Sequence, residues 1–228
     1  MNKDILYHGS QFIIDKPEFD KPEYGKGKIH NDYGRGFYCT KHKELAKEWA
    51  VSENINGYIN TYEIDMSKLK ILDLRNDCYS ILHWLALLLD NREFSVRSPV
   101  ALRGRQFILE NYLIDTTEYD LIIGYRADDS YFSFARDFIN NTISVEQLNY
   151  AMKLGELKEQ YVLVSQKAFE NITYINSEPV SSFEYYPKRK QRDENARKAY
   201  FDQLNAADIN GIYIRDLING ALPNEKSL

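Results

Sequence analysis

The pattern of apolar and polar positions along the chain predicts strands interspersed with helices. The run 57–64 (GYINTYEI) alternates with the two-residue period of a half-buried strand. Other short runs of apolar, β-branched or aromatic residues predict further strands at 5–10, 37–40, 71–74, 119–124, 159–165 and 172–175.

Helical spacing appears between these runs. Leu45, Ala46, Trp49 and Ala50 recur at helical intervals, and Thr40 is a candidate N-cap for their helix. The run 78–89 is apolar on most faces, which predicts a buried helix. Other predicted helices cover 131–139, 144–154, 166–171 and 188–204, and the run 211–214 is compatible with a strand or with the start of a closing helix.

Local signals and charge patterns complete this picture. Ser144 and Gln147 occupy the positions of a capping box, and Gly155 fits the end of the helix that they begin. The run 188–198 (KRKQRDENARK) predicts a solvated helical face, with an RNA- or protein-docking surface as the alternative. No repeat or low-complexity linker divides the chain. We therefore expect one domain over 1–228, with helical insertions at about 76–112 and 130–155 and a charged C-terminal helix at about 190–205.

Composition narrows the class of protein. The 228 residues are 43% hydrophobic, enough for one substantial core, and the net charge of -5 argues against general binding to nucleic acid or to an anionic membrane. Cys39 and Cys78 lack metal-type spacing, and the four histidines are scattered, so we expect no metal site. Nothing at the N-terminus resembles a signal peptide, and the apolar run 81–89 is too short to span a bilayer. We expect a cytoplasmic protein with reduced thiols and no membrane partner.

One stretch, 30–50, combines the features of a ligand site. Two glycines flank Arg35, a strand follows with Tyr38, and a helix then brings Trp49. Two such rings can form an aromatic slot that suits a flat heteroaromatic ligand, while the alternative is that both belong to the core. Upstream, His8 lies at the polar end of a strand, a common place for ligand contacts, although a structural histidine is also compatible with this position.

Two charged segments are further candidates. Arg92, Arg97, Arg103 and Arg105 make a local basic density that can pair with carboxylates or bind an anion. The second segment, Asp128–Asp129, follows a predicted strand, where it can cap the next helix or hold a ribose hydroxyl or a substrate cation.

Taken together, these motifs resemble the ADP-ribosyltransferase superfamily. The matching residues are Tyr7–Ser10, then Tyr33–Tyr38 followed by Ala46 and Trp49, then Gln160–Val162. The resemblance is to the diphtheria-toxin and poly(ADP-ribose)-polymerase branch, which has a His-Tyr-Glu triad. Within that branch the chain is similar to a bacterial family of uncharacterised ADP-ribosyltransferase-like proteins, which tends to show a segment like 119–129 here.

The resemblance implies an α+β fold of split antiparallel β-sheets with flanking helices and a helical insertion. It also implies that His8 holds a ribose hydroxyl, that the Gly9 backbone bonds the nicotinamide carboxamide, and that Tyr38 stacks on the nicotinamide ring. Ala46 falls where many relatives keep a carboxamide-binding Ser, and Trp49 lies against the other side of the nicotinamide ring in place of a common Tyr. Residues with implied cofactor contacts are Gly9, Ser10, Arg35, Gly36, Ala46 and Trp49.

The third triad position departs from the family pattern. Members with full activity place Glu at the start of this strand, where the chain has Gln160. A carboxylate can bond a ribose hydroxyl and stabilise positive charge on the sugar, whereas an amide does only the first well. Glu159 is adjacent, but successive strand residues point to opposite faces, so Glu159 would need a bulge to substitute. Asp128, Asp129 and Glu156 are candidates to supply the charge from a loop.

The leading hypothesis is an NAD-dependent mono-ADP-ribosyltransferase without a metal, in which His8, Tyr38 and Gln160 form the site. Its acceptor is a protein or nucleic acid held by the loops around 97–105 and 127–130. The resemblance implies a bacterial toxin or defence effector with a neutralising partner protein. The alternatives are a catalytically weak or inactive module that binds NAD or ADP-ribose, favoured by Gln160, and an NAD glycohydrolase.

Overall fold

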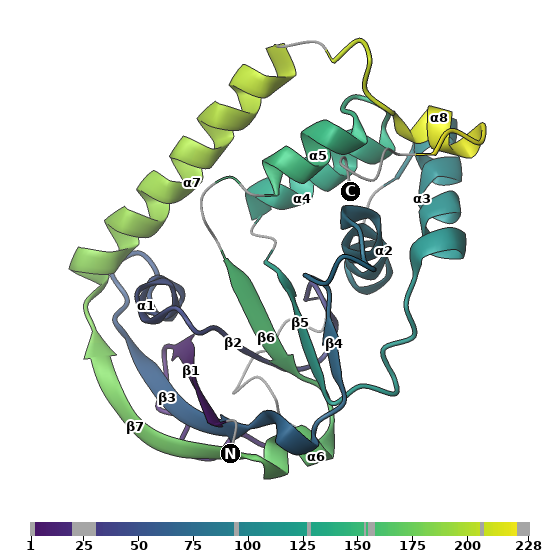
Figure 1. Ribbon diagram of the computed structural model, residues 1–228. Coiled ribbons are helices and arrows are strands. Elements are labelled where there is room, and N and C mark those ends of the chain that lie inside the picture. The colour runs from purple at the N-terminus through teal and green to yellow at the C-terminus, as the bar shows by residue number, and fades with distance from the viewer. Residues whose placement is uncertain are drawn as a thin grey trace.

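The computed structural model describes residues 3–19, 31–93, 96–126, 129–152, 154, 158–205 and 208–222. Its described strands form two sheets (Figure 1). The first sheet has the order β1 (Lys3–Ser10), β3 (Gly57–Asp65) and β7 (Ile172–Val180). The second has the order β2 (Phe37–Cys39), β6 (Glu159–Leu163), β5 (Leu121–Tyr125) and β4 (Ile71–Asp73). With the helices described below, this arrangement confirms the α+β class.

The pairing of the strands is antiparallel with one exception. β1, β3 and β7 pair antiparallel, as do β2, β6 and β5, but β4 joins β5 in parallel. The expectation of antiparallel sheets is therefore wrong for this edge. The connection from β4 to β5 runs through α2 and α3, which gives the crossover length that a parallel pair requires.

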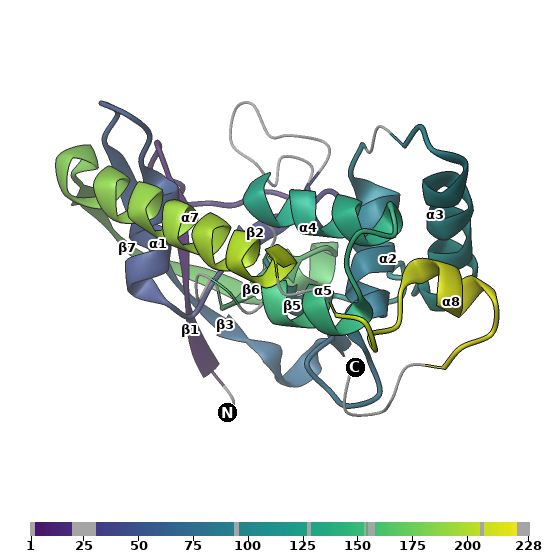
Figure 2. The same cartoon turned by 90° about the horizontal axis from the view of Figure 1, so that it is seen from above.

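The helices gather on both sides of the sheets. Their bounds are α1 (Lys43–Ala50), α2 (Ile81–Asn91), α3 (Pro99–Tyr112), α4 (Asp129–Ile139), α5 (Val145–Ala151), α6 (Gln166–Glu170), α7 (Ser182–Asn205) and α8 (Ile214–Ile218), with a 3-10 turn at Met66–Lys68. In both views of the molecule α1 lies with the first sheet, whereas α2, α3 and α8 lie at the opposite end (Figures 1 and 2). The long helix α7 contacts α1 near its start and α4 further along.

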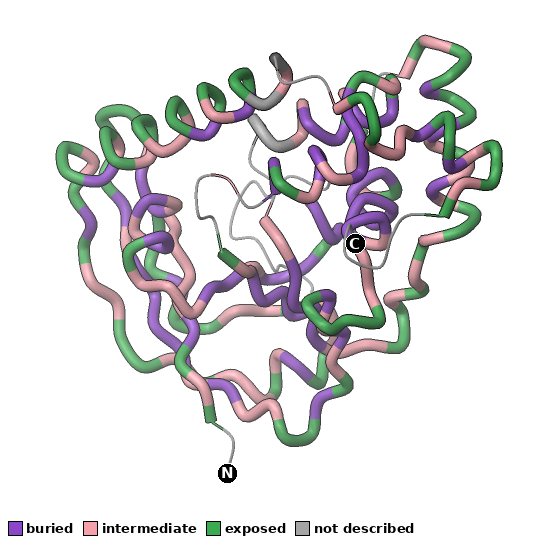
Figure 3. Tube along the Cα trace, turned by 45° about the horizontal axis from the view of Figure 1, so that its top comes forward, coloured by how far each residue is buried: buried purple, intermediate pink, exposed green. Residues whose placement is uncertain are grey.

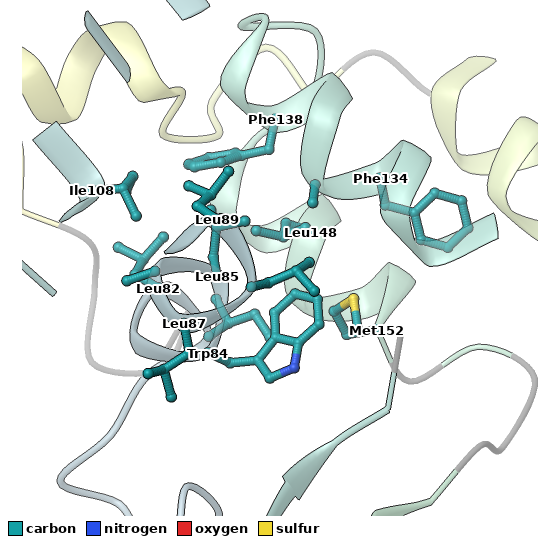
Figure 4. Packing of buried hydrophobic residues seen from close by; sticks show 14 of the residues in the cluster. Leu82, Trp84, Leu85, Leu87, Leu89, Ile108, Phe134, Phe138, Leu148 and Met152 are labelled. Carbon is teal, nitrogen blue, oxygen red and sulfur yellow. The ribbon is translucent and has the colours of Figure 1, made fainter. Parts of the chain in front are cut away.

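The larger core surrounds α2. This helix is apolar all round and its sequence ILHWLALLLDN is buried on nearly every side, unlike α7, which is exposed along most of its length (Figure 3). Leu85 and Trp84 lie among side chains from α4 and α5, including Phe138 and Leu148 (Figure 4). The prediction of a buried helix in this run is confirmed, and its Trp84 is only 1% exposed.

Alternation along the strands divides the second sheet between two cores. Val162 faces the helical core, whereas Tyr161 and Leu163 lie with Phe37 in a second core between the sheets. At the junction, Tyr7 of β1 and Thr40 after β2 exchange backbone hydrogen bonds of 2.8 and 2.9 Å. This bridge joins the strand that carries His8 to the strand that carries Tyr38.

Several element ends differ from the predictions. The N-cap of α1 is His42 and not Thr40, whose hydroxyl instead accepts from the His42 amide and donates to the Glu159 carbonyl. The helix predicted at 188–204 begins earlier, at Ser182, and includes Pro187 near its start. The capping box of Ser144 and Gln147 is confirmed, whereas Gly155 lies outside the described residues.

Two kinds of feature are absent from the described residues. No described helix is both long and apolar enough to cross a membrane. No group of three or more potential metal-binding side chains occurs within the described ranges.

Candidate active site

His8 lies two residues before the end of β1, against the backbone of β2. Its Nδ1 donates to the Tyr38 carbonyl oxygen over 2.7 Å, and its ring stacks on Phe37 with centroids 4.4 Å apart. Because a carbonyl can only accept, the proton of a neutral His8 ring is on Nδ1, and Nε2 is a hydrogen-bond acceptor. Burial lowers the pKa of His8 to about 4, although the bond to Tyr38 opposes this shift. The imidazole is therefore neutral at physiological pH.

Gly9 lets the end of β1 approach helix α1. A Cβ at this position would lie 1.9 Å from the Ala46 carbonyl oxygen and 2.7 Å from the Ala50 amide nitrogen. Ala46 is fully buried. The structure thus brings Gly9 and Ala46, two predicted cofactor contacts from distant parts of the sequence, into direct contact. The neighbouring Ser10 uses its hydroxyl to accept from the Phe12 amide.

Tyr38 is held by the glycine turn that precedes it. Its hydroxyl donates to the Gly34 carbonyl over 2.6 Å and accepts from the Tyr33 amide over 3.1 Å. Gly34 has a φ of 73°, a left-handed conformation that favours glycine. With its hydroxyl engaged in the turn, Tyr38 has only its ring to offer a ligand.

Arg35 and Gly36, the other predicted cofactor contacts in this turn, lie against other parts of the protein. A Cβ at Gly36 would lie 2.6 Å from a methyl group of Val162, so this glycine is needed for packing on β6. Arg35 and Gly36 line a cavity of about 150 Å³ together with Phe19 and Phe169. At Gly36, therefore, the absence of a side chain allows the chain to approach strand β6 closely.

Gln160 starts the third strand of the motif and is 3% exposed. Tyr38 pairs with Val162 across β2 and β6, so Gln160, two residues before Val162, lies on the same face of the sheet as Tyr38. Its Nε2 donates to Asp32 Oδ2 over 3.1 Å and to the Tyr125 carbonyl over 3.2 Å. The amide is thus fixed by two partners from other segments.

Asp32 is a buried carboxylate beside this amide. Its Oδ1 accepts from Arg92 Nε over 2.9 Å and from Arg92 Nη2 over 2.5 Å. Of the two readings of the basic segment, pairing with a carboxylate is confirmed for Arg92. No local pattern marks Asp32 as a site residue, because an acid in a turn-rich stretch is usually solvated and its partner lies 60 residues away.

The Tyr125 carbonyl is the second hub of this cluster. Besides Gln160, it accepts from the Tyr33 hydroxyl over 2.7 Å and from Trp84 Nε1 over 3.1 Å. Three donors from the glycine turn, α2 and β6 therefore meet at the end of β5. Burial raises the pKa of Tyr33 well above its usual value, so its hydroxyl stays a donor.

Trp49 lies on the side of α1 that faces the end of β5. The guanidinium of Arg126, the residue after Tyr125, lies over the Trp49 ring at 3.9 Å from its centroid. A planar cation thus covers one face of the ring to which the resemblance assigns the nicotinamide. Arg126 is a second site residue that the sequence analysis missed.

Glu159 does not lie on the face of Gln160. β5 and β6 pair without a bulge, and the Glu159 carboxylate lies 3.6 Å from His42 Nε2 and 3.6 Å from the guanidinium of Arg75. Asp128 and Glu156 lie outside the described residues, and of Asp129 only its place as the first residue of α4 is described.

The acceptor segment 97–105 is also remote from these residues. It runs into α3, which packs on α2, α4 and α8 and lies at the opposite end of the molecule from α1 (Figures 1 and 2). Arg105 there donates to the Leu89 carbonyl over 3.2 Å.

The part of the chain that matches a known family includes the described site residues. Residues 5–174 match the model of a family described as "Protein of unknown function (DUF3990)". The chain belongs to this family. The match contains every described site residue above, from His8 to Gln160, whereas α7 and α8 lie beyond it. No curated protein and no solved structure matches the chain.

Proposed function

We propose that the protein is an NAD-dependent mono-ADP-ribosyltransferase with an ADP-ribosyltransferase-like fold. The observation that supports it most is the convergence of three strands. β1 bridges β2 and β2 pairs with β6, so the strands that carry His8, Tyr38 and Gln160 lie side by side in the order that the superfamily motif requires. The two sheets and the contact of Gly9 with α1 agree with the same proposal.

Each group has a role that follows from its hydrogen bonds. Neutral His8 presents Nε2 as an acceptor, which suits a ribose hydroxyl as donor. The Gly9 backbone bonds the carboxamide of nicotinamide. The Tyr38 ring stacks on the cationic nicotinamide, an interaction worth roughly 1–2 kcal/mol when desolvated. These contacts orient NAD but do not break its glycosidic bond.

The reaction breaks the bond between the anomeric carbon and the nicotinamide nitrogen, and the nitrogen keeps the electron pair. An acceptor heteroatom forms the new bond to that carbon and loses its proton to solvent. Positive charge develops on the sugar, and stabilising it contributes most in a site of low dielectric constant. Gln160 offers only a dipole there, so we expect slow transfer of single ADP-ribose units and no polymer.

One observation favours a second candidate, a module that binds NAD or ADP-ribose without turning it over. Gln160 is hydrogen-bonded to the carboxylate of Asp32, and Arg92 neutralises that carboxylate. A neutral cluster at this position can bind a ribose hydroxyl just as a charged cluster can. It stabilises a cationic transition state poorly, however.

Incubation of the purified protein and a bacterial lysate with NAD labelled in its adenylate part separates the candidates. Label on a macromolecule supports transfer, free ADP-ribose supports hydrolysis, and binding without turnover supports the module. His8→Ala should weaken NAD binding at least tenfold while the protein stays folded. His83→Ala, a histidine variant on α2, is the matched control and should bind NAD normally. Absence of NAD binding by the wild-type protein would overturn all three candidates.

A further inference from the structure

We infer that Asp32 is a positioning residue that turns Gln160 so that its amide oxygen, and not its NH2 group, is presented to the ligand. The inference rests on the proposed function and names the chemistry of one contact. At the third motif position the site accepts a hydrogen bond from a ribose hydroxyl with a neutral amide oxygen.

The orientation of the amide follows from its partners. The Asp32 carboxylate and the Tyr125 carbonyl are both acceptors, at 3.1 and 3.2 Å from Gln160 Nε2. Only an NH2 group can satisfy both of them, so both of its hydrogens are committed. No hydrogen bond from the described residues reaches Gln160 Oε1, which therefore remains as the acceptor for a ligand.

Arg92 compensates for the burial of the Asp32 carboxylate. Its Nε and Nη2 both donate to Oδ1 of Asp32, and Oδ2 is the atom that accepts from Gln160. A buried carboxylate is stable only when it is paired and hydrogen-bonded. The pair thus supplies a fixed acceptor that selects one of the two orientations of the amide.

The same geometry predicts that restoring the family's Glu is not a simple reversion. Gln160→Glu would place one carboxylate against the Oδ2 of Asp32, where like charges repel, and would take one donor away from the Tyr125 carbonyl. Asp32→Asn brings two donors together, where Gln160→Glu brings two acceptors together. Its NH2 group would face the NH2 group of Gln160, or else the amide would turn over and present its NH2 group to the ligand.

The double variant exchanges the two groups. In Asp32→Asn with Gln160→Glu, an amide at position 32 donates to a carboxylate at position 160, and Arg92 can still donate to the amide oxygen. The Tyr125 carbonyl keeps its donors Tyr33 and Trp84. The exchange should therefore rescue the pair, which a merely structural loss of either group could not do.

The experiment compares the two single variants and the double variant by thermal unfolding and by calorimetric titration with NAD. Each single variant should lower the unfolding midpoint by about 4–10 °C and weaken NAD binding by roughly 10–100-fold. The double variant should regain at least half of both losses. Glu48→Gln is the matched control, because Glu48 is an equally buried carboxylate paired with Arg192; it should lower the midpoint and leave NAD affinity unchanged.

Side-chain NMR of the wild-type protein provides a test that needs no variant to fold. Both Gln160 NH2 protons should exchange slowly with solvent. Fast exchange of either proton, or additive losses in the double variant, would overturn the inference. If the wild-type protein binds no NAD, the proposed function falls, and the role in presenting Oε1 to that ligand falls with it; recovery of the midpoint would then establish the pairing alone.

Discussion

Two buried arginine–carboxylate pairs of this protein have the same chemistry and different geometry. Asp32 and Glu48 have side chains that are 5% and 6% exposed, and each binds one arginine through two nitrogens. Arg192 gives one hydrogen bond to each oxygen of Glu48, at 3.0 and 2.8 Å. Arg92 donates through Nε and Nη2 to the same oxygen of Asp32, Oδ1.

The difference separates a structural contact from a site contact. With both oxygens bound by Arg192, Glu48 joins α1 to α7, a helix beyond the family match. In Asp32 the second oxygen holds Gln160, so the same kind of ion pair orients a group at the candidate active site. A buried ion pair by itself is weak evidence for function. What distinguishes this one is the third group to which it is attached.

Removal of the arginines should give the largest effects. Arg92→Met leaves the Asp32 charge buried and should cost about 3–5 kcal/mol in the free energy of unfolding, measured by urea titration. Arg192→Met should cost about 2–3 kcal/mol, because Arg192 is more exposed than Arg92, at 28% against 19%. Only Arg92→Met should reduce NAD affinity. A larger cost for Arg192→Met would contradict the comparison.

Lowering the pH should reveal the contribution of His8 to the free energy of unfolding. Because the pKa of His8 is about 4 when folded and about 6.5 when unfolded, the unfolded state binds more protons between these values. Stability contributed by His8 is complete above pH 6.5 and falls by up to about 3 kcal/mol as the pH drops through 4. His8→Gln should lack this part of the pH dependence of unfolding, whereas Glu48→Gln should keep it. Equal slopes in all three proteins would remove His8 as its cause.

Two tyrosines allow a smaller comparison. The Tyr38 hydroxyl bonds two backbone groups of the glycine turn, whereas the Tyr185 hydroxyl bonds the side chains of Glu44 and Lys47. Tyr38→Phe should cost about 1–2 kcal/mol because it leaves backbone groups unsatisfied, and Tyr185→Phe about 0.5–1 kcal/mol. Both variants keep the ring, so NAD affinity should change less than about threefold. A tenfold loss in Tyr38→Phe would show that the hydroxyl contacts the ligand.

The smallest effect on stability should come from two cations that lie over aromatic rings. Arg126 covers Trp49 at 3.9 Å, and Lys188 covers Tyr185 at 4.2 Å. Either change to Ala should cost less than about 1 kcal/mol. Arg126→Ala should strengthen NAD binding about 3–10-fold, because the guanidinium no longer competes for the ring face. Lys188→Ala should leave NAD affinity as it was, and weaker binding in Arg126→Ala would instead make Arg126 a ligand contact.

The strand positions agree with what local patterns predict. Each predicted strand has a counterpart, and His8, Tyr38 and Gln160 lie on β1, β2 and β6. Such patterns succeed because a strand's period and a capping box depend on neighbours within a few residues. They fail where a partner is distant: Thr40 is no cap because its hydroxyl reaches the Glu159 carbonyl.

The sequence alone therefore determined the α+β class, the order of the elements and the residue types at three motif positions. The tertiary structure decided what surrounds them. Asp32 became a buried anchor only because Arg92 lies beside it, and Trp49 is covered only because Arg126 directly follows the end of β5. Burial and pairing depend on contacts between segments tens of residues apart, and no local pattern contains those contacts.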